Sequence, residues 1–190
     1  MDREGFKTFI RNILKEMLKE KRMHFYNNEY CFQIWFCHAA QCLIERDTNY
    51  SSLRLVPEYS SSDFNSLFSK GSKRIDILFY DISSKEKYLI ELKYKTRKNK
   101  SKTVYSNRDL KMSVGGNNKI DSMYGDLNRT VALFKEDKKL KFGCLLLATN
   151  WTEKTKGSKI ENNKELKLEL VNDVAFNELD FYWRILENEN

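Results

Sequence analysis

Apolar residues recur every three or four positions over residues 3 to about 20, which predicts an amphipathic helix with Asp2 as its capping residue. A second helix is expected over residues 29 to 46, where apolar side chains occupy most sides, as is typical of a buried helix. The same helical spacing predicts a third helix that contains Ile120, Met123, Leu127, Val131 and Phe134.

Short apolar runs predict strands between and after these helices. Pro57 indicates that the first strand lies at a sheet edge or carries a bulge, because proline lacks the amide donor of a strand ladder. The polar residues 83 to 86 separate the second run from the third and predict a hairpin. The four runs cover residues 53 to 59, 74 to 81, 88 to 95 and 142 to 148.

The C-terminal part is expected to contain a strand near residues 166 to 171 and a short helix over 177 to 187. The whole pattern predicts an α/β fold with a mixed central sheet of four to five strands flanked by helices. A chain of 190 residues suits a single domain. Within it we expect an N-terminal helical extension (1–27), a core (29–150) and a C-terminal strand and helix (151–190).

Composition gives only weak evidence about the partners and the cellular location of the protein. The formal net charge of +7 favours polyanionic partners, although ribosomal and membrane-surface proteins share this property. No stretch resembles a signal peptide or is long enough to span a bilayer, so we expect a cytoplasmic protein without a membrane partner. The four cysteines form no CxxC pair and are interpreted as reduced, buried thiols, and His38 with Cys42 lacks the second ligand pair of a zinc site.

Three charged residues interrupt the otherwise apolar strands of the predicted hairpin: Asp76 on one strand, and Glu91 and Lys93 on the other. Glu91 and Lys93 point to one face, because side chains alternate along a strand. If the hairpin closes near Ser84, Asp76 lies roughly opposite Glu91. We therefore expect two carboxylates and an ammonium to converge on a mostly buried patch.

Burying two neighbouring carboxylates is costly unless a cation neutralises them. Mg²⁺ prefers oxygen ligands, so Asp76, Glu91 and the main-chain carbonyl of Leu92 suit it, and Mn²⁺ is expected to substitute. The metal would polarise a phosphate and activate a water, and Lys93 would orient that water. The alternative interpretation is an ordinary salt bridge among the three side chains, which we disfavour because the flanking residues are apolar.

Asp76 followed by Glu91-Leu92-Lys93 resembles the PD-(D/E)XK nuclease superfamily, whose fold is restriction-endonuclease-like. The family order is a helix, a strand, an aspartate-bearing strand hairpinned to a Glu-x-Lys strand, a helix and a strand, and residues 29 to 150 offer that order. Ile75 stands where the family motif has proline. The resemblance implies a metal-dependent nuclease, with DNA favoured over RNA, 5′-phosphate products and a role in restriction, defence or repair.

A closer likeness links the chain to uncharacterised restriction-endonuclease-like proteins through Glu29 with Gln33, the 91–96 run, Asp126 with Arg129, and Thr149 with Asn150. It implies that Glu29 flanks the metal site. The alternative is a carboxylate that stabilises a helix N-terminus, and we leave both open.

Related enzymes often carry another acidic residue in the first strand. Glu58 would then assist as a metal ligand, or it faces water on an edge strand. Asp126 and Arg129 we interpret as an ion pair on a helix surface, since such pairs are frequent.

A basic segment leaves the Glu-x-Lys strand directly and is expected to contact phosphates, whereas the alternative is a solvated loop without a partner. The resemblance also makes a homodimer plausible. Two rival functions stay open: a nucleic-acid-binding module that kept the fold without catalysis, and an interaction protein with an acidic partner. The expected phosphate contacts are Lys95, Arg97, Lys98, Lys100, Lys102, Arg108 and Lys111.

Overall fold

The computed structural model describes residues 1–19, 29–60, 74–95, 119–149, 167–176 and 179–189, and the statements below concern these residues. The chain forms α helices, one 3-10 turn and strands in the order α1 (Arg3–Lys19), α2 (Glu29–Arg46), η2 (Thr48–Tyr50), β1 (Leu53–Ser60), β2 (Arg74–Asp81), β3 (Lys87–Lys95), α4 (Lys119–Glu136), β4 (Leu140–Thr149), β5 (Glu169–Phe176) and β6 (Leu179–Glu187). The helices predicted over 3 to 20, over 29 to 46 and around 120 to 134 are confirmed, as are the four strands predicted between 53 and 148. β5 overlaps the strand predicted near 166 to 171.

The strands form one mixed sheet in the order β1-β2-β3-β4-β6-β5, so the α/β class is confirmed. The sheet has six strands, and the prediction of four to five was therefore wrong. The predicted helix over 177 to 187 was also wrong, because β6 occupies this segment and pairs with β4 on one side and β5 on the other. β1 lies at the sheet edge, as Pro57 indicated.

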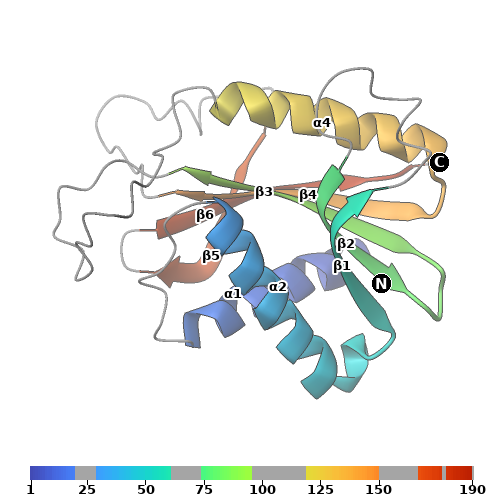
Figure 1. The fold of residues 1–190 in the computed structure, drawn as a ribbon, viewed down its shortest axis with the longest axis horizontal. Coiled ribbons are helices and arrows are strands. Elements are labelled where there is room, and N and C mark those ends of the chain that lie inside the picture. Colours follow the sequence, from blue (N-terminus) through green and yellow to red (C-terminus); the bar gives the residue numbers. More distant parts are fainter. Residues whose placement is uncertain (20–28, 61–73, 96–118, 150–166, 177–178, 190) are drawn as a thin grey trace, which may run out of the picture.

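Helices cover both faces of the sheet, as Figure 1 shows: α1 and α2 lie on one face and α4 lies on the other. α1 is an integral part of the larger core and not an appendage, since its apolar stripe is fully buried against α2 and the sheet. Asp2 caps this helix as predicted, because its carboxylate accepts the amide hydrogen of Gly5 at 2.7 Å. The buried stripe consists of Phe6, Phe9, Ile10, Ile13, Leu14 and Met17.

The second face matters more for the site, because α4 connects β3 to β4, and these two strands run parallel along their whole length. A parallel pair requires such a crossover, which places the connecting helix over the strands that it joins. Leu133 and Phe134 of α4 pack against Leu89 of β3 and Leu140 of β4. Polar residues of α4 are thereby brought over the middle of β3.

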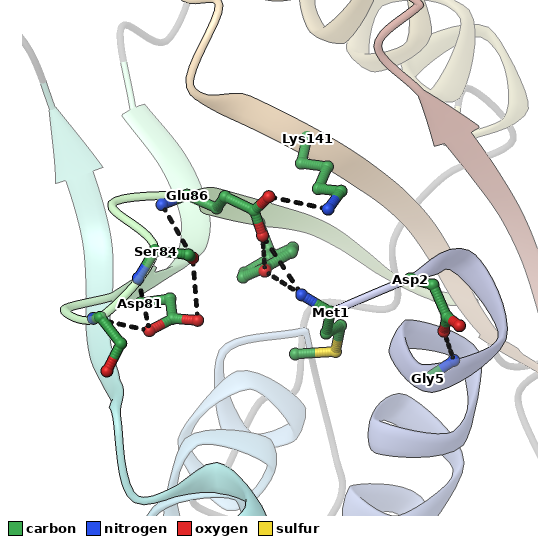
Figure 2. A network of polar contacts seen from close by, with 9 residues as sticks. Met1, Asp2, Gly5, Asp81, Ser84, Glu86 and Lys141 are labelled. Carbon is green, nitrogen blue, oxygen red and sulfur yellow. Dashed lines mark hydrogen bonds and ion pairs between the residues drawn. The ribbon is translucent and has the colours of Figure 1, made fainter.

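The turn between β2 and β3 carries a separate polar network, drawn in Figure 2. Glu86 accepts hydrogen bonds from Lys141 at 2.7 Å and from the hydroxyl of buried Tyr88. The amino group of Met1 lies 3.2 Å from the same carboxylate. Burial raises the pKa of Glu86, but the hydrogen bonds from Lys141 and Tyr88 prevail and lower it to about 2. This carboxylate therefore stays ionised and fixes the hairpin turn to β4 and α1.

Two further expectations concern the whole chain. No helix among the described residues is long and apolar enough to cross a membrane. All four cysteines are free, as expected, but only Cys144 is buried, so the prediction of burial was wrong for the three cysteines of α2.

Gly143 of β4 lies directly under α4, so a substitution there tests how tightly the helix packs on the sheet. A Cβ atom there would lie 2.7 Å from the Cγ2 of buried Thr130 on α4 and 3.2 Å from the Cδ1 of Leu89. We expect Gly143→Ala to lower the free energy of unfolding by about 1–3 kcal/mol, as overpacking does. The matched control is Gly125→Ala within α4, where nothing lies within 4 Å of the added atom.

The control should raise the free energy of unfolding by about 0.5–1 kcal/mol, because alanine favours a helix over glycine. Urea unfolding measures both changes. Equal stability of Gly143→Ala and the wild type would contradict the tight packing of α4 on β4.

Candidate active site

The antiparallel ladder of β2 and β3 stops one residue before Asp76. Ile77 pairs with Ile90, and Asp76 and Glu91 are the next residues on the two strands. Beyond this point a side chain joins the two strands instead of a backbone pair: Oδ2 of Asp76 accepts the amide hydrogen of Leu92 at 2.7 Å. Burial raises the pKa of Asp76, while the bond from Leu92 opposes that rise. The hairpin thus brings the two predicted carboxylates together.

Glu91 is the most buried charged group of the site, with 1% of its surface exposed. Arg129 donates to its Oε1 twice, through Nε at 3.0 Å and through Nη2 at 2.7 Å. The other oxygen, Oε2, is buried and has no hydrogen-bond partner among the described residues. Burial and the negative charge of Asp76 raise the pKa of Glu91 to about 8, although Arg129 acts in the opposite direction.

Lys93 lies on the same face of β3 as Glu91, as alternation predicted. Its Nζ is 3.0 Å from Oδ2 of Asp126 and 3.6 Å from Oε1 of Glu29, and it donates to the carbonyl oxygen of Leu92 at 3.0 Å. Burial lowers the pKa of Lys93, but attraction to Asp126 and Glu29 outweighs it and raises the pKa overall. Lys93 therefore stays an ammonium.

Asp126 and Arg129 form the predicted ion pair, but the prediction that this pair lies on a helix surface was wrong. Asp126 is buried, and its Oδ1 accepts from Arg129 Nη2 at 2.7 Å while Arg129 also holds Glu91. The parallel crossover explains the difference, since it places α4 over the charged centre of β3. Among the described residues, the ion pairs of Lys93 are with Asp126 and Glu29, and Glu91 pairs with Arg129, so the simple salt bridge among Asp76, Glu91 and Lys93 is not what forms.

Glu29 and Gln33, at the first turns of α2, both reach the strands. Glu29 Oε2 accepts the amide hydrogen of Tyr94 at 3.2 Å, which places its carboxylate at the end of β3 beside Lys93. Gln33 is buried and donates from Nε2 to Oε1 of Glu58 at 2.8 Å and to the carbonyl oxygen of Asp76 at 2.9 Å. Gln33 thereby ties β1 to β2 directly beside Asp76.

Glu58 sits at an irregular point of β1. Its φ of 50° lies in the left-handed region, which costs a non-glycine residue conformational energy. Pairing passes from Pro57 with Ile77 to Tyr59 with Ile75, so Glu58 and Asp76 are skipped at the same place. The side chain of Glu58 is 45% exposed and lies 3.8 Å from Arg74. The structure therefore places Glu58 on the open rim of the site. Gln33 links it to Asp76, because it donates to the Glu58 carboxylate and to the carbonyl oxygen of Asp76.

Among the residues that the structure describes, the charges of the site do not balance. Four carboxylates act on one another here, those of Glu29, Asp76, Glu91 and Asp126, against the two cations Lys93 and Arg129. If all of them ionise, an excess of two negative charges remains in a partly buried region. Burial is the largest cause of the raised pKa values of Asp76 and Glu91, and neighbouring carboxylates add to the rise, so each carboxyl is favoured in its neutral form.

The donor set suits a hard divalent cation. Among the described residues, no group of three or more His, Cys, Asp and Glu side chains is gathered as a metal cage. Mg²⁺ does not require one, since it commonly takes one or two carboxylates and completes its shell with water and substrate oxygens. The buried Oε2 of Glu91, which lacks a partner in the described structure, offers such a donor beside Asp76.

The predicted phosphate contacts lie beyond the part of the chain that the structure describes. Lys95 ends β3, but its side chain lies outside the described part of the structure. Arg97, Lys98, Lys100, Lys102, Arg108 and Lys111 also fall outside the described residues.

A cavity of about 380 Å³ lies at the opposite end of β3, lined by the β2–β3 turn and by the residues that begin β4, including Lys85 and Lys139. It is separate from the carboxylate cluster and contributes nothing to it.

No protein-family model, no curated protein and no solved structure matches this chain. The functional conclusion therefore depends on the fold and the side-chain geometry.

Proposed function

We propose that the chain is a Mg²⁺-dependent nuclease that hydrolyses phosphodiester bonds, with DNA as the favoured substrate. The observation that carries the proposal is the charge imbalance around Asp76 and Glu91, two carboxylates whose pKa values are raised by burial and, for Glu91, by the other carboxylate. A divalent cation supplies two positive charges, which equals the excess of negative charge among the described residues of the cluster. Binding the cation would return both carboxyls to the ionised form.

The residues divide into distinct roles. Asp76 and Oε2 of Glu91 would hold the cation, and the carbonyl oxygen of Leu92 and the rim carboxylate of Glu58 are further oxygen donors nearby. When bound, the cation polarises a phosphate and lowers the pKa of a water molecule. The Lys93 ammonium orients the attacking water and stabilises negative charge that develops on the phosphate. Glu29 keeps Lys93 at the end of β3, and Gln33 fixes the backbone of Asp76.

The order of elements supports the proposal further. From α2 to β4 the chain runs helix, strand, aspartate-bearing strand, Glu-x-Lys strand, helix and parallel strand. This is the order that the resemblance to PD-(D/E)XK nucleases implies. With that resemblance, we extend the proposal to a restriction-endonuclease-like protein of a restriction, defence or repair setting, acting as a homodimer when it cuts both strands.

A cleavage assay tests the proposal. The purified protein is incubated with supercoiled plasmid, single-stranded DNA or RNA, each with Mg²⁺, Mn²⁺ or EDTA. We expect cleavage of DNA with either metal, none in EDTA, and ends that a ligase accepts because they carry 5′-phosphates. Asp76→Asn should reduce the rate by at least about 10²-fold, as the loss of a metal ligand does.

The matched control is Asp173→Asn, at an exposed position of β5 whose φ of 62° asparagine tolerates well. This variant should cut like the wild type. Binding of DNA without cutting, under all metal conditions, would favour the non-catalytic binding module instead. Equal rates for Asp76→Asn and the wild type would show that the activity does not arise at this site.

A further inference from the structure

The two oxygens of the Glu91 carboxylate have different surroundings. Two donors of Arg129 converge on Oε1, Nε at 3.0 Å and Nη2 at 2.7 Å. Oε2 is buried and has no hydrogen-bond partner among the described residues. One oxygen thus accepts both of these hydrogen bonds from the guanidinium, and the other is left without a donor among the described residues.

This division is unusual for an arginine–carboxylate pair, which commonly uses two parallel hydrogen bonds to two oxygens. The chain itself contains such a pair for comparison. Arg46 donates through Nη1 to Oε1 of Glu16 at 3.0 Å and through Nη2 to Oε2 at 2.7 Å. The Arg46 pair lies at the surface and satisfies both oxygens, whereas the buried Arg129 pair satisfies one.

Asp126 also accepts a hydrogen bond from the guanidinium. It stands one helical turn before Arg129 on α4, and its Oδ1 accepts from Nη2 at 2.7 Å, the nitrogen that also reaches Glu91. The other oxygen of Asp126 lies 3.0 Å from Lys93 Nζ. Arg129 is therefore held from two sides.

We infer that Arg129 is a positioning residue for metal binding: it fixes Glu91 through Oε1 alone and so keeps Oε2 directed at a divalent cation. The inference rests on the proposed function and adds a residue that the Asp76/Glu91/Lys93 motif does not include. Arg129 does not touch the cation in this assignment. It acts through Glu91, as a partner that orients a metal-binding carboxylate.

A purely structural salt bridge predicts a different outcome. In that case Arg129 would stabilise the fold, and its replacement would change the melting temperature but leave metal affinity unaltered in any variant that folds. The two roles therefore separate in a binding measurement that needs no substrate.

The test is Mn²⁺ binding to the full chain without nucleic acid, with free Mn²⁺ quantified by electron paramagnetic resonance. We expect Arg129→Met to weaken Mn²⁺ binding by about 10–100-fold, the usual effect of losing a residue that orients a ligand. Arg129→Lys should recover part of this loss, because an ammonium keeps the positive charge but not the fork of donors. If Arg129→Met does not fold, Arg129→Lys carries the test, with circular dichroism as the check of folding.

Two further variants make the result interpretable. Arg46→Lys alters the surface pair with Glu16 and should bind Mn²⁺ like the wild type. Glu91→Gln removes the ligand itself and should bind far more weakly. Wild-type affinity in folded Arg129→Lys and Arg129→Met, together with loss in Glu91→Gln, overturns the inference and leaves the proposed function standing. Failure of the wild type to bind Mn²⁺, or wild-type affinity in Glu91→Gln, overturns the proposed function and the inference with it.

Discussion

Replacing Lys93 with methionine should reduce the cleavage rate by about 10²–10³-fold while leaving nucleic-acid binding largely intact, the effect expected for a donor that acts mainly in the transition state. Methionine keeps the unbranched length of the side chain but removes the charge that Asp126 and Glu29 hold at 3.0 and 3.6 Å. The cleavage rate is measured with Mg²⁺ at saturating enzyme, and binding is measured with Ca²⁺ in place of Mg²⁺.

The matched control for this prediction is Lys87→Met. Lys87 lies on the same strand, its ammonium pairs with Asp137 at 2.6 Å, and it stands six residues from Lys93 near the opposite end of β3. This variant should keep the wild-type rate. Undiminished cutting by Lys93→Met would remove Lys93 from the mechanism and leave the roles of Asp76 and Glu91 to be tested on their own.

Glu91→Gln should make the metal-free protein more stable at pH 8 and less sensitive to pH. The folded protein holds the proton of Glu91 up to a pKa of about 8, against the ordinary value of 4.5. Between these values the unfolded chain has lost a proton that the folded chain retains. The stability of the wild type therefore falls as pH rises through this window, by up to about 1.4 kcal/mol per pH unit. Glutamine has no proton to lose, so the slope from this residue disappears.

Urea unfolding in EDTA at pH 5, 6.5 and 8 measures the effect. Glu45→Gln, at an exposed position of α2, is the control and should follow the wild-type curve. Added Mg²⁺ should stabilise the wild type at pH 8 more than Glu91→Gln, since a ligand that binds only the folded state raises its stability. If the free energy of unfolding depends on pH in the same way in the wild type and in Glu91→Gln, the pKa of Glu91 is not raised in the folded protein.

The hairpin could be predicted from sequence because local signals agree there. Apolar runs define β2 and β3, a polar turn separates them, and alternation fixes which residues share a face. These signals are sufficient to predict that Asp76, Glu91 and Lys93 lie together. They could not show that the ladder ends at Ile77 and Ile90, because the bond from Leu92 to the Asp76 side chain replaces a backbone pair.

The segment of β6 lacks the alternation of apolar and polar residues that indicates a strand, and the helix predicted over 177 to 187 was wrong. Phe181, Tyr182 and Trp183 are consecutive and all buried, since β6 lies between β4 and β5 with both faces covered. Such a strand gives a continuous apolar run, which periodicity does not distinguish from a short buried helix. Without alternation, the segment offered no evidence for a further strand.

The contribution of α4 to the site was missed because it depends on long-range geometry, with 38 residues separating Arg129 from Glu91. One signal was nonetheless present in the sequence. Met123, Asp126, Thr130 and Leu133 follow helical spacing, and the structure buries all four. A carboxylate within the buried stripe of a helix needs a partner, and this would have pointed Asp126 toward the sheet.

Asp126 has a mechanical consequence. Its two oxygens hold Arg129 and Lys93 separately, and both Asp126 and Arg129 belong to one rigid helix that rests on β3 and β4. A displacement of that helix away from the sheet would break the contact of Arg129 with Glu91 and that of Asp126 with Lys93 in a single movement. The contacts that α4 supplies would thus be lost together, whereas Glu29 and Asp76 would keep their own contacts with β3.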